Sequence, residues 1–168
     1  MRQQFLAAMS RAACTVNVVT TDGRAGKAGL TLSAMVSVSA DTDPPTLLIC
    51  VHEQTLTAQR IAENGVFCVN VLRDSQAHIS DCFAGRGDLQ GEAKFACSQW
   101  RTSELGSPLL EEALVSFDCR VVSTQKVGTH FLFLGAVHHA EAPQDGSPLI
   151  YLQRRYATPA RLDGCAAR

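Results

Sequence analysis

The stretch 127-VGTHFLFLGAVHHAEA-142 predicts one long β-strand over 129–142, because the apolar run Phe131–Leu134 continues into further apolar and small residues. The preceding stretch, 113–127, has the same character, and Val127-Gly128 supplies a turn between them. We therefore expect two long neighbouring strands. His130 stands where the second strand begins. From the residues alone, it is either a hydrogen-bonded structural histidine or a histidine that faces a pocket.

The rest of the chain predicts a mainly β protein with short helices. Thr55 is a candidate N-cap for a helix over 56–64, which Asn64-Gly65 would end. Strands and helices do not alternate, which argues against a doubly wound sheet and favours an antiparallel barrel with helices packed on it. We expect one domain over 1–168. The other expected elements are strands at 13–23, 28–40, 46–52, 66–72 and 147–156, helices at 2–11 and 75–83, and a loop-rich stretch over 84–108.

Composition excludes several classes of function. A formal net charge of −1 gives no electrostatic reason to expect nucleic acid or an anionic membrane as a partner. No apolar run approaches the ~20 residues of a membrane helix, and the start of the chain does not resemble a signal peptide, so we expect a cytoplasmic protein. The seven cysteines are scattered and lack C-x-x-C spacing, which indicates neither a disulfide framework nor a metal site.

Motifs for common chemistries are missing from the sequence. There is no G-x-G-x-x-G after a strand, no G-x-x-x-x-G-K-[ST], no H-E-x-x-H and no G-x-S-x-G. The remaining candidates are small hydroxylic residues at strand ends and turns. Thr31 and Ser33 share one strand face, either as an exposed polar face or as the lining of a polar ligand. Thr55 opens a helix whose N-terminus could attract a phosphate. Phe83-Ala84-Gly85-Arg86 is either a helix end with a solvated arginine or a loop that admits a planar ring and presents a cation to an anion.

A set of motifs in a fixed order carries a family resemblance. The segments are AGLTLSAMVSVSADTDPPTLLICV, NGVFCVNVL, ISDCFAGRG, SFDCRVV, VGTHFLFLGAV and SPLIYLQRRY. From about residue 5 to residue 157 the chain closely resembles the short-chain flavin reductases, the reductase components of two-component flavin-dependent aromatic monooxygenases. The resemblance implies an FMN-binding split β-barrel, antiparallel and Greek-key-like, that forms a homodimer. Strands such as 46–52 are apolar on both faces, which also favours a second subunit as a cover.

The resemblance further implies an NAD(P)H:flavin oxidoreductase. It would transfer a hydride from NADH, or from NADPH, to FAD or FMN, and the reduced flavin would leave for a separate monooxygenase. The tail 147–162 looks most like the branch that serves phenol-type hydroxylases, which favours FAD. By matching motif, Thr31, Ser33 and Ala34 would line the flavin ring and ribityl chain. Cys50, Val51, His52 and Thr55 would form a strand end and phosphate loop, Phe83, Ala84, Gly85 and Arg86 a loop against the flavin, and His130 and Tyr156 the nicotinamide side.

The family context favours a functional His130. Hydride passes directly between the two cofactors, so the protein needs only to position and polarise them, and His130 would be the residue that does so. One position departs from the family pattern: Glu53 stands where an arginine is usual, and an acid there would repel a phosphate. Two other functions stay open at this point. One is a split-barrel protein that binds flavin without catalysis, and the other is a small barrel that binds an apolar ligand.

Overall fold

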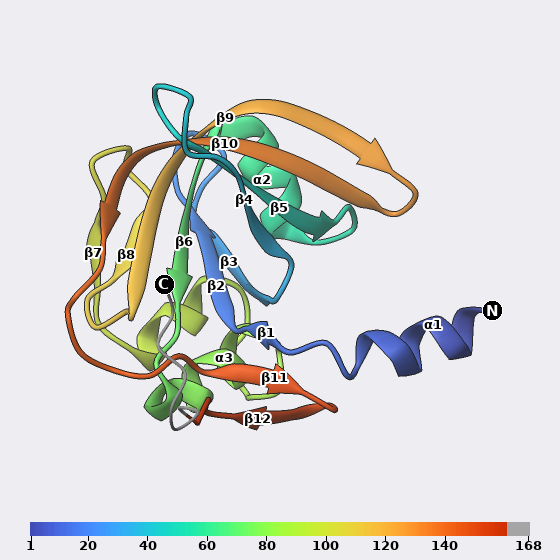
Figure 1. The fold of residues 1–168 in the computed structure, drawn as a ribbon. Helices are drawn as coiled ribbons and strands as arrows, with labels where there is room; N and C mark the ends of the chain where they lie inside the picture. Colours follow the sequence, from blue (N-terminus) through green and yellow to red (C-terminus); the bar gives the residue numbers. More distant parts are fainter. Residues whose placement is uncertain (161–168) are drawn as a thin grey trace.

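The computed structural model describes residues 1–160; Cys165 and the rest of 161–168 lie outside the described residues. Its main feature is a seven-stranded antiparallel sheet. The two edge strands, β3 and β4, are joined by only Ser33 and Ala34, so the sheet has to curl until its edges meet, which gives a barrel (Figure 1). The strand order is β3 (Ala28–Leu32), β2 (Asn17–Thr21), β6 (Val66–Val71), β9 (Val115–Val127), β10 (His130–Glu141), β5 (Thr46–His52) and β4 (Met35–Ser39).

The long hairpin of β9 and β10 is confirmed. Gly128 sits at the turn with φ +58°, a backbone conformation that glycine adopts without strain. β10 pairs with β9 on one side and with β5 on the other, and His130 lies opposite His52 in the β5 pairing. Two register shifts, at Leu134/Gly135 and Val137/His139, bend the hairpin around the barrel.

Two of the α-helices pack against the barrel, and the third extends away from it. α2 (Leu56–Asn64) is confirmed with both of its expected ends: the Thr55 hydroxyl accepts from the Ala58 N–H, and Gly65 ends the helix at φ +72°. α3 (Ala77–Phe83) follows a 3₁₀ turn, η1 (Asp74–Gln76). α1 (Arg2–Met9) extends away from the body as an arm, and all its residues are exposed (Figure 1). Within residues 1–160, no helix has the length and apolar character needed to cross a bilayer.

Four expectations need correction. The expected strand 28–40 is two strands, because the chain turns at Ser33-Ala34. The expected strand 147–156 is a tight hairpin, since Gln153 and Arg154 adopt positive φ values of 51° and 63°. The expected strand 13–23 divides in the same way, and the loop-rich stretch contains ordered elements. The additional elements are β1 (Cys14–Thr15), η2 (Gly91–Cys97), β7 (Trp100–Thr102), β8 (Pro108–Leu110), β11 (Ile150–Leu152) and β12 (Arg155–Ala157).

Two hydrophobic cores meet at β2, which is buried along its whole length. Val19 points into the first core, inside the barrel, with Ile49, Phe67 and Phe133. Val18, the next residue, points to the opposite face and into the second core, where α3 contributes Ile79, Cys82 and Phe83 among others. The polar residues of the strand are buried as well, and the Thr21 hydroxyl donates to the Val66 carbonyl at 2.7 Å. The arrangement fixes α3 against the barrel.

Gly135 tests the packing of the first core. A Cβ at this position would lie 2.5 Å from Phe67 Cζ and 3.0 Å from Cys119 Cβ, both inside the core. Gly135→Ala is therefore expected to lower the free energy of unfolding by ~1–3 kcal/mol, measured by denaturant titration. Gly87→Ala, where a Cβ meets nothing within 4 Å, is the matched control and should change it by less than ~0.5 kcal/mol. Equal stability of the two variants would contradict this packing.

Candidate functional site

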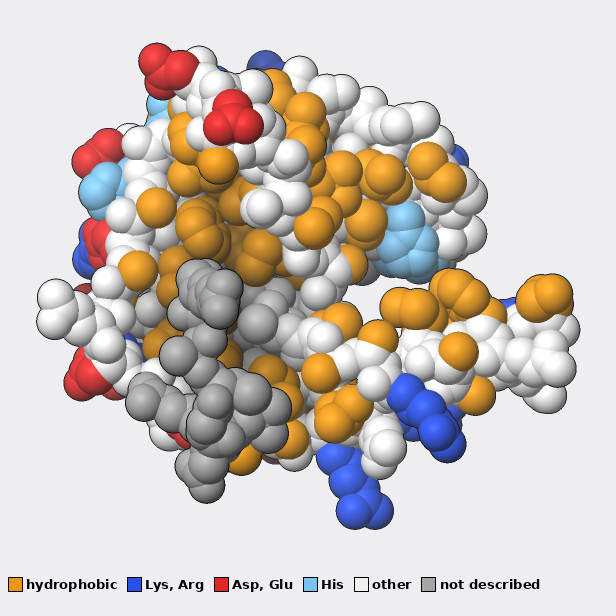
Figure 2. Space-filling model, viewed as in Figure 1, with side chains coloured by type: hydrophobic (Ala, Val, Ile, Leu, Met, Phe, Trp, Pro, Cys, Tyr) orange, Lys and Arg blue, Asp and Glu red, His pale blue; other side chains and the backbone are white. Residues whose placement is uncertain are grey.

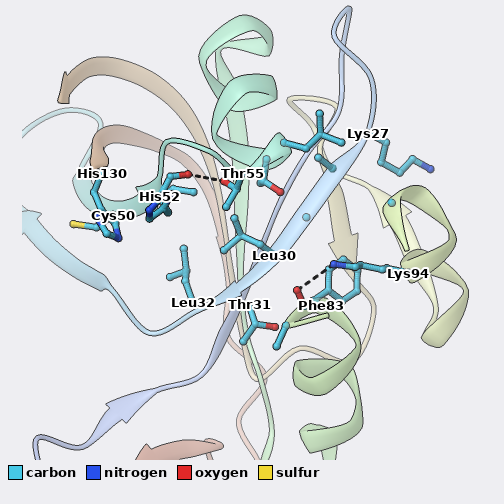
Figure 3. Close-up of a pocket in the computed structure, with 17 residues that line it drawn as sticks. Lys27, Leu30, Thr31, Leu32, Cys50, His52, Thr55, Phe83, Lys94 and His130 are labelled. Atoms are coloured by element: carbon cyan, nitrogen blue, oxygen red, sulfur yellow. Dashed lines mark hydrogen bonds between the residues drawn. The ribbon is translucent and has the colours of Figure 1, made fainter. Parts of the chain in front are cut away.

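A cavity of about 520 Å³ opens between β3, the adjoining ends of β5 and β10, the first turn of α2 and the last turn of α3 (Figure 3). We call it the large cavity. Its volume lies within the ~300–1,000 Å³ usual for small-molecule sites. Its lining residues are Lys27, Ala28, Gly29, Leu30, Thr31, Leu32, Cys50, Val51, His52, Thr55, Leu56, Thr57, Phe83, Ala84, Gly91, Lys94 and His130.

One wall of the large cavity depends on a close approach of α3 to β3. A Cβ on Gly29 would lie 2.7 Å from Phe83 Cε1, so only glycine lets the Phe83 ring reach the strand. Thr31 joins the same two elements, because its hydroxyl donates to the Ser80 carbonyl at 2.7 Å. The Thr31 proton is therefore engaged within the protein. Thr31 can still accept a hydrogen bond from a ligand through its second lone pair.

Two histidines occupy one end of the large cavity. His52 and His130 face each other edge to face, with ring centroids 5.1 Å apart. His130 Nδ1 lies 3.1 Å from the Thr129 hydroxyl, and His52 Nδ1 accepts from the Gln54 N–H at 3.2 Å. His130 is exposed, belongs to neither core and lines the large cavity.

The first turn of α2 forms a second part of the lining. Thr55 caps the Ala58 N–H, while Leu56 and Thr57 stand at the positions whose N–H groups lack an intrahelical acceptor. These N–H groups and the helix dipole favour an anion. Cys50 lies nearby on β5, and burial raises the pKa of its thiol, so it stays protonated and neutral at physiological pH.

Glu53 does not line the large cavity, which changes the expectation drawn from the sequence. Its carboxylate forms an ion pair with Lys126 on β9, and this hydrogen-bonded cation lowers the pKa of Glu53. The negative charge is therefore offset locally. The departure from the family pattern at this position does not place an unpaired acid beside the cavity.

Two lysines at the other end of the large cavity were missed from the sequence. Lys27 precedes β3 and Lys94 lies on η2, and the two are far apart in the chain (Figure 3). No local pattern connects them, because only the packing of η2 near β3 brings them together. All lining residues belong to the described part of the chain, and none of them is acidic. The cavity is thus suited to an anionic ligand with an apolar middle.

A second cavity of about 220 Å³, the small cavity, adjoins the first through Thr31, Leu32 and Ala84. The Tyr156 hydroxyl donates to Asp81 Oδ1 at 2.7 Å and lies 2.8 Å from the Ser80 hydroxyl. The pKa of Tyr156 is raised, mainly because the phenol is partly buried. Arg86 forms an ion pair with the same Asp81 oxygen at 3.0 Å, which offsets part of its charge locally. Besides the three shared residues, the small cavity is lined by Val16, Ser33, Ser80, Arg86, Tyr151 and Tyr156.

The structure thus distributes the expected site residues over two cavities. His130 and Tyr156, expected on the same side, line different cavities within one chain. Ala34 and Gly85 line neither. Within residues 1–160, no group of three or more His, Cys, Asp or Glu side chains could hold a metal ion. The expected residues at the large cavity are Thr31, Cys50, Val51, His52, Thr55, Phe83, Ala84 and His130, and those at the small cavity are Thr31, Ser33, Ala84, Arg86 and Tyr156.

Comparison with known proteins gives a consistent family. The flavin reductase like domain family matches residues 9–160. The FMN reductase (NADH) RutF of Ancylobacter novellus is 45% identical over 157 residues, which cover 92% of this chain and 83% of that protein.

Solved structures give the same result. The NADH:FAD oxidoreductase SgcE6 of Streptomyces globisporus, in complex with NAD and FAD fragments, superposes with a TM-score of 0.86 at 27% identity, covering 98% of this chain and 95% of that chain. BorF, the flavin reductase component of a bacterial two-component tryptophan halogenase, has a TM-score of 0.85 at 28% identity and covers 96% of this chain and 100% of its own.

Proposed function

The chain belongs to the flavin reductase like family, an oxidoreductase family, and we propose that it reduces a flavin with NADH in its large cavity. The observation that carries the proposal is the charge pattern of that cavity. Histidines stand at one end, beside the free N–H groups of the first turn of α2, because the Thr55 hydroxyl donates to the His52 carbonyl at 2.8 Å. An apolar middle follows, and two lysines stand at the other end, with no acid in the lining. A flavin carries groups that suit these parts: a planar ring for the apolar middle and a phosphate for the helix N–H groups or the cations.

The residues have distinct tasks in this proposal. A bound flavin supplies the hydride-accepting ring. Leu30, Phe83 and Ala84 exclude water from the apolar middle and hold a planar ring, while the first turn of α2 binds a phosphate. His130 positions and polarises the ring end through Nε2, since its Nδ1 is turned to Thr129. The small cavity, with Ser33 and Tyr156, lies beside the ring position and is proposed as the nicotinamide side.

The family also suggests the place of the reaction. We propose that the reduced flavin leaves this protein and serves a separate monooxygenase. BorF is likewise the flavin reductase component of a two-component system, in its case a tryptophan halogenase. The resemblance of the tail points to an oxygenase that attacks aromatic compounds. Six cysteines of the described residues are free thiols, which fits a cytoplasmic enzyme with access to NADH. NADH is the nicotinamide named for the RutF relative, and NADPH is the alternative.

A homodimer is part of the proposal. The α1 arm carries exposed Phe5, Leu6 and Met9, and further exposed apolar side chains lie on β4 and β9, including Val36 and Val122. Figure 2 shows hydrophobic side chains along the arm and on the face of the body beside it. Apolar surface of this kind is unfavourable in water, and a second copy of the chain could cover it with its own arm.

The enzymatic function predicts flavin-dependent loss of NADH. Under anaerobic conditions, the purified protein should oxidise NADH when FMN or FAD is added and should need no aromatic substrate, measured at 340 nm. His130→Ala should lower kcat/KM for NADH, which corresponds to a loss of ~1–3 kcal/mol of transition-state stabilisation, because one positioning contact is lost while the flavin still binds. Its melting temperature should stay close to that of the wild type, since His130 is exposed.

Two outcomes would contradict this account. Flavin binding without any NADH oxidation would favour the non-enzymatic flavin-binding function instead. A His130→Ala variant that loses thermal stability but keeps the wild-type kcat/KM would show that His130 serves only the fold.

The homodimer predicts a mass close to twice 18.0 kDa by light scattering at micromolar concentration. Replacing two apolar residues of the arm, in Phe5→Ser/Met9→Ser, should weaken the dimer, because α1 makes no buried contact with its own body. A strictly monomeric wild-type protein would contradict the proposal.

A further inference from the structure

We propose that Asp81, which lines neither cavity, is a positioning residue for NADH: it holds Arg86 and Tyr156 in the wall of the small cavity, so that the Arg86 guanidinium binds the carboxamide of the nicotinamide ring. The inference rests on the proposed function, because it concerns the nicotinamide side of the same site. It goes beyond that function by naming the group that recognises the ring and the residue that orients this group.

Asp81 is the centre of a hydrogen-bond network at the last turn of α3. Its Oδ1 accepts from the Tyr156 hydroxyl at 2.7 Å and from Arg86 at 3.0 Å. Because the single hydroxyl proton of Tyr156 goes to Asp81, the Ser80 hydroxyl, 2.8 Å away, donates to the Tyr156 oxygen. Partial burial raises the pKa of Tyr156, so the phenol stays protonated. The Tyr156 hydroxyl is therefore engaged within the protein, and Tyr156 offers a ligand its ring.

Arg86 is the group of this wall that keeps hydrogen-bond donors for a ligand. A guanidinium has several N–H groups in one plane, and a single carboxylate oxygen of Asp81 uses only part of them. The Arg86 guanidinium lies 6.0 Å from the centre of the Tyr156 ring. Hydrogen bonding to Tyr151 and Asp81 raises the pKa of Arg86, so it stays charged. Arg86 lines the small cavity, where its remaining N–H groups can donate to a ligand oxygen.

The small cavity has the size and chemistry for one ring of a cofactor. Its volume of about 220 Å³ is below the ~300–1,000 Å³ usual for a whole small molecule. The rings of Tyr151 and Tyr156, 5.7 Å apart, and the hydroxyls of Thr31 and Ser33 form much of its lining. The nicotinamide is a flat ring with a carboxamide, whose oxygen accepts from a guanidinium and whose NH₂ group donates to a hydroxyl oxygen. The large cavity, which adjoins this one, accounts for the flavin.

The ion pair with Asp81 matters because the backbone alone does not fix the guanidinium. Arg86 follows the end of α3, and its side chain is 55% exposed. The Asp81 carboxylate bonds both the guanidinium and the Tyr156 hydroxyl, so it sets their relative position. Since the Asp81 side chain is itself 44% exposed, solvent screens the pair. Its effect is therefore expected on the geometry of the small cavity rather than on the stability of the fold.

The test measures NADH kinetics and flavin affinity separately in two variants. Asp81→Asn should raise KM for NADH about fivefold and Arg86→Gln about tenfold, with kcat changed less than about threefold, because binding of the ring is lost in the ground and transition states alike. Dissociation constants of FMN and FAD, measured by flavin fluorescence, should change by less than about twofold, since neither residue lines the large cavity. The matched control, Asp88→Asn, removes the same charge at an exposed position outside both cavities and should leave all values unchanged.

A double-mutant cycle separates positioning from a role in the fold. In an Arg86→Gln background, Asp81→Asn should raise KM for NADH little further, because Asp81 acts on the ring through Arg86. The carboxamide contact is tested with the reduced thionicotinamide analogue of NADH, whose sulfur accepts a hydrogen bond less strongly than oxygen. The wild type should prefer NADH to this analogue, and Arg86→Gln should reduce the preference.

Several results would overturn the inference while leaving the proposed function intact. These are an unchanged KM for NADH in either variant, a loss of flavin affinity as large as the effect on NADH, and additive effects in the double variant. An Asp81→Asn protein that fails to fold would assign Asp81 to the fold and would also overturn its positioning role. Absence of NADH oxidation by the wild type would instead overturn the proposed function, and this inference with it.

Discussion

The contact between Gly29 and Phe83 is the constraint on which the rest of the site depends. Because Gly29 lacks a side chain, the last residue of α3 can pack directly on β3. From this position the Phe83 ring contacts Phe95 and Trp100, with centroids 5.1 and 5.4 Å away. η2 is thereby held near β3, and its Lys94 hydrogen-bonds the Phe83 carbonyl. A single absent Cβ thus determines where the wall and the cationic end of the large cavity lie.

The opposite end of the cavity has a different origin. The pairing of β5 with β10 sets His52 opposite His130, and no helix takes part in it. The site therefore combines a histidine end, carried by the barrel, with a lysine end formed by Lys27, which precedes β3, and Lys94 on η2. A ligand that bridges the two ends contacts both structural layers.

Sequence reasoning predicted the elements whose signals are local. Glycine at position 128 indicates the turn between β9 and β10, and Thr55 and Gly65 are residue types that commonly begin and end a helix, as they do for α2. The turn at Ser33-Ala34 was missed because it interrupts an alternating pattern without glycine or proline. The β11–β12 turn was missed for a related reason, since Gln153 and Arg154 are uncommon at positive φ.

The site shows the same division between local and tertiary signals. The family motifs indicated eight of the residues that line the large cavity, because they lie on strand ends and helix ends whose order is fixed by the fold. Lys27 and Lys94 could not be predicted, since their proximity depends on how η2 packs. The pairing of Arg86 with Asp81, and of Glu53 with Lys126, is likewise a tertiary result that assigns each charge a partner.

The flavin dissociation constant of Gly29→Ala tests this account most directly. A Cβ 2.7 Å from Phe83 and 3.2 Å from the Val19 carbonyl must displace the Phe83 ring from the cavity wall, and because the ring contact with the flavin is then lost, we predict about a tenfold loss of flavin affinity. Gly87→Ala serves as the control, because its Cβ meets no neighbour. A folded Gly29→Ala protein that binds flavin as tightly as the wild type would contradict the claim that the Gly29–Phe83 contact shapes the site.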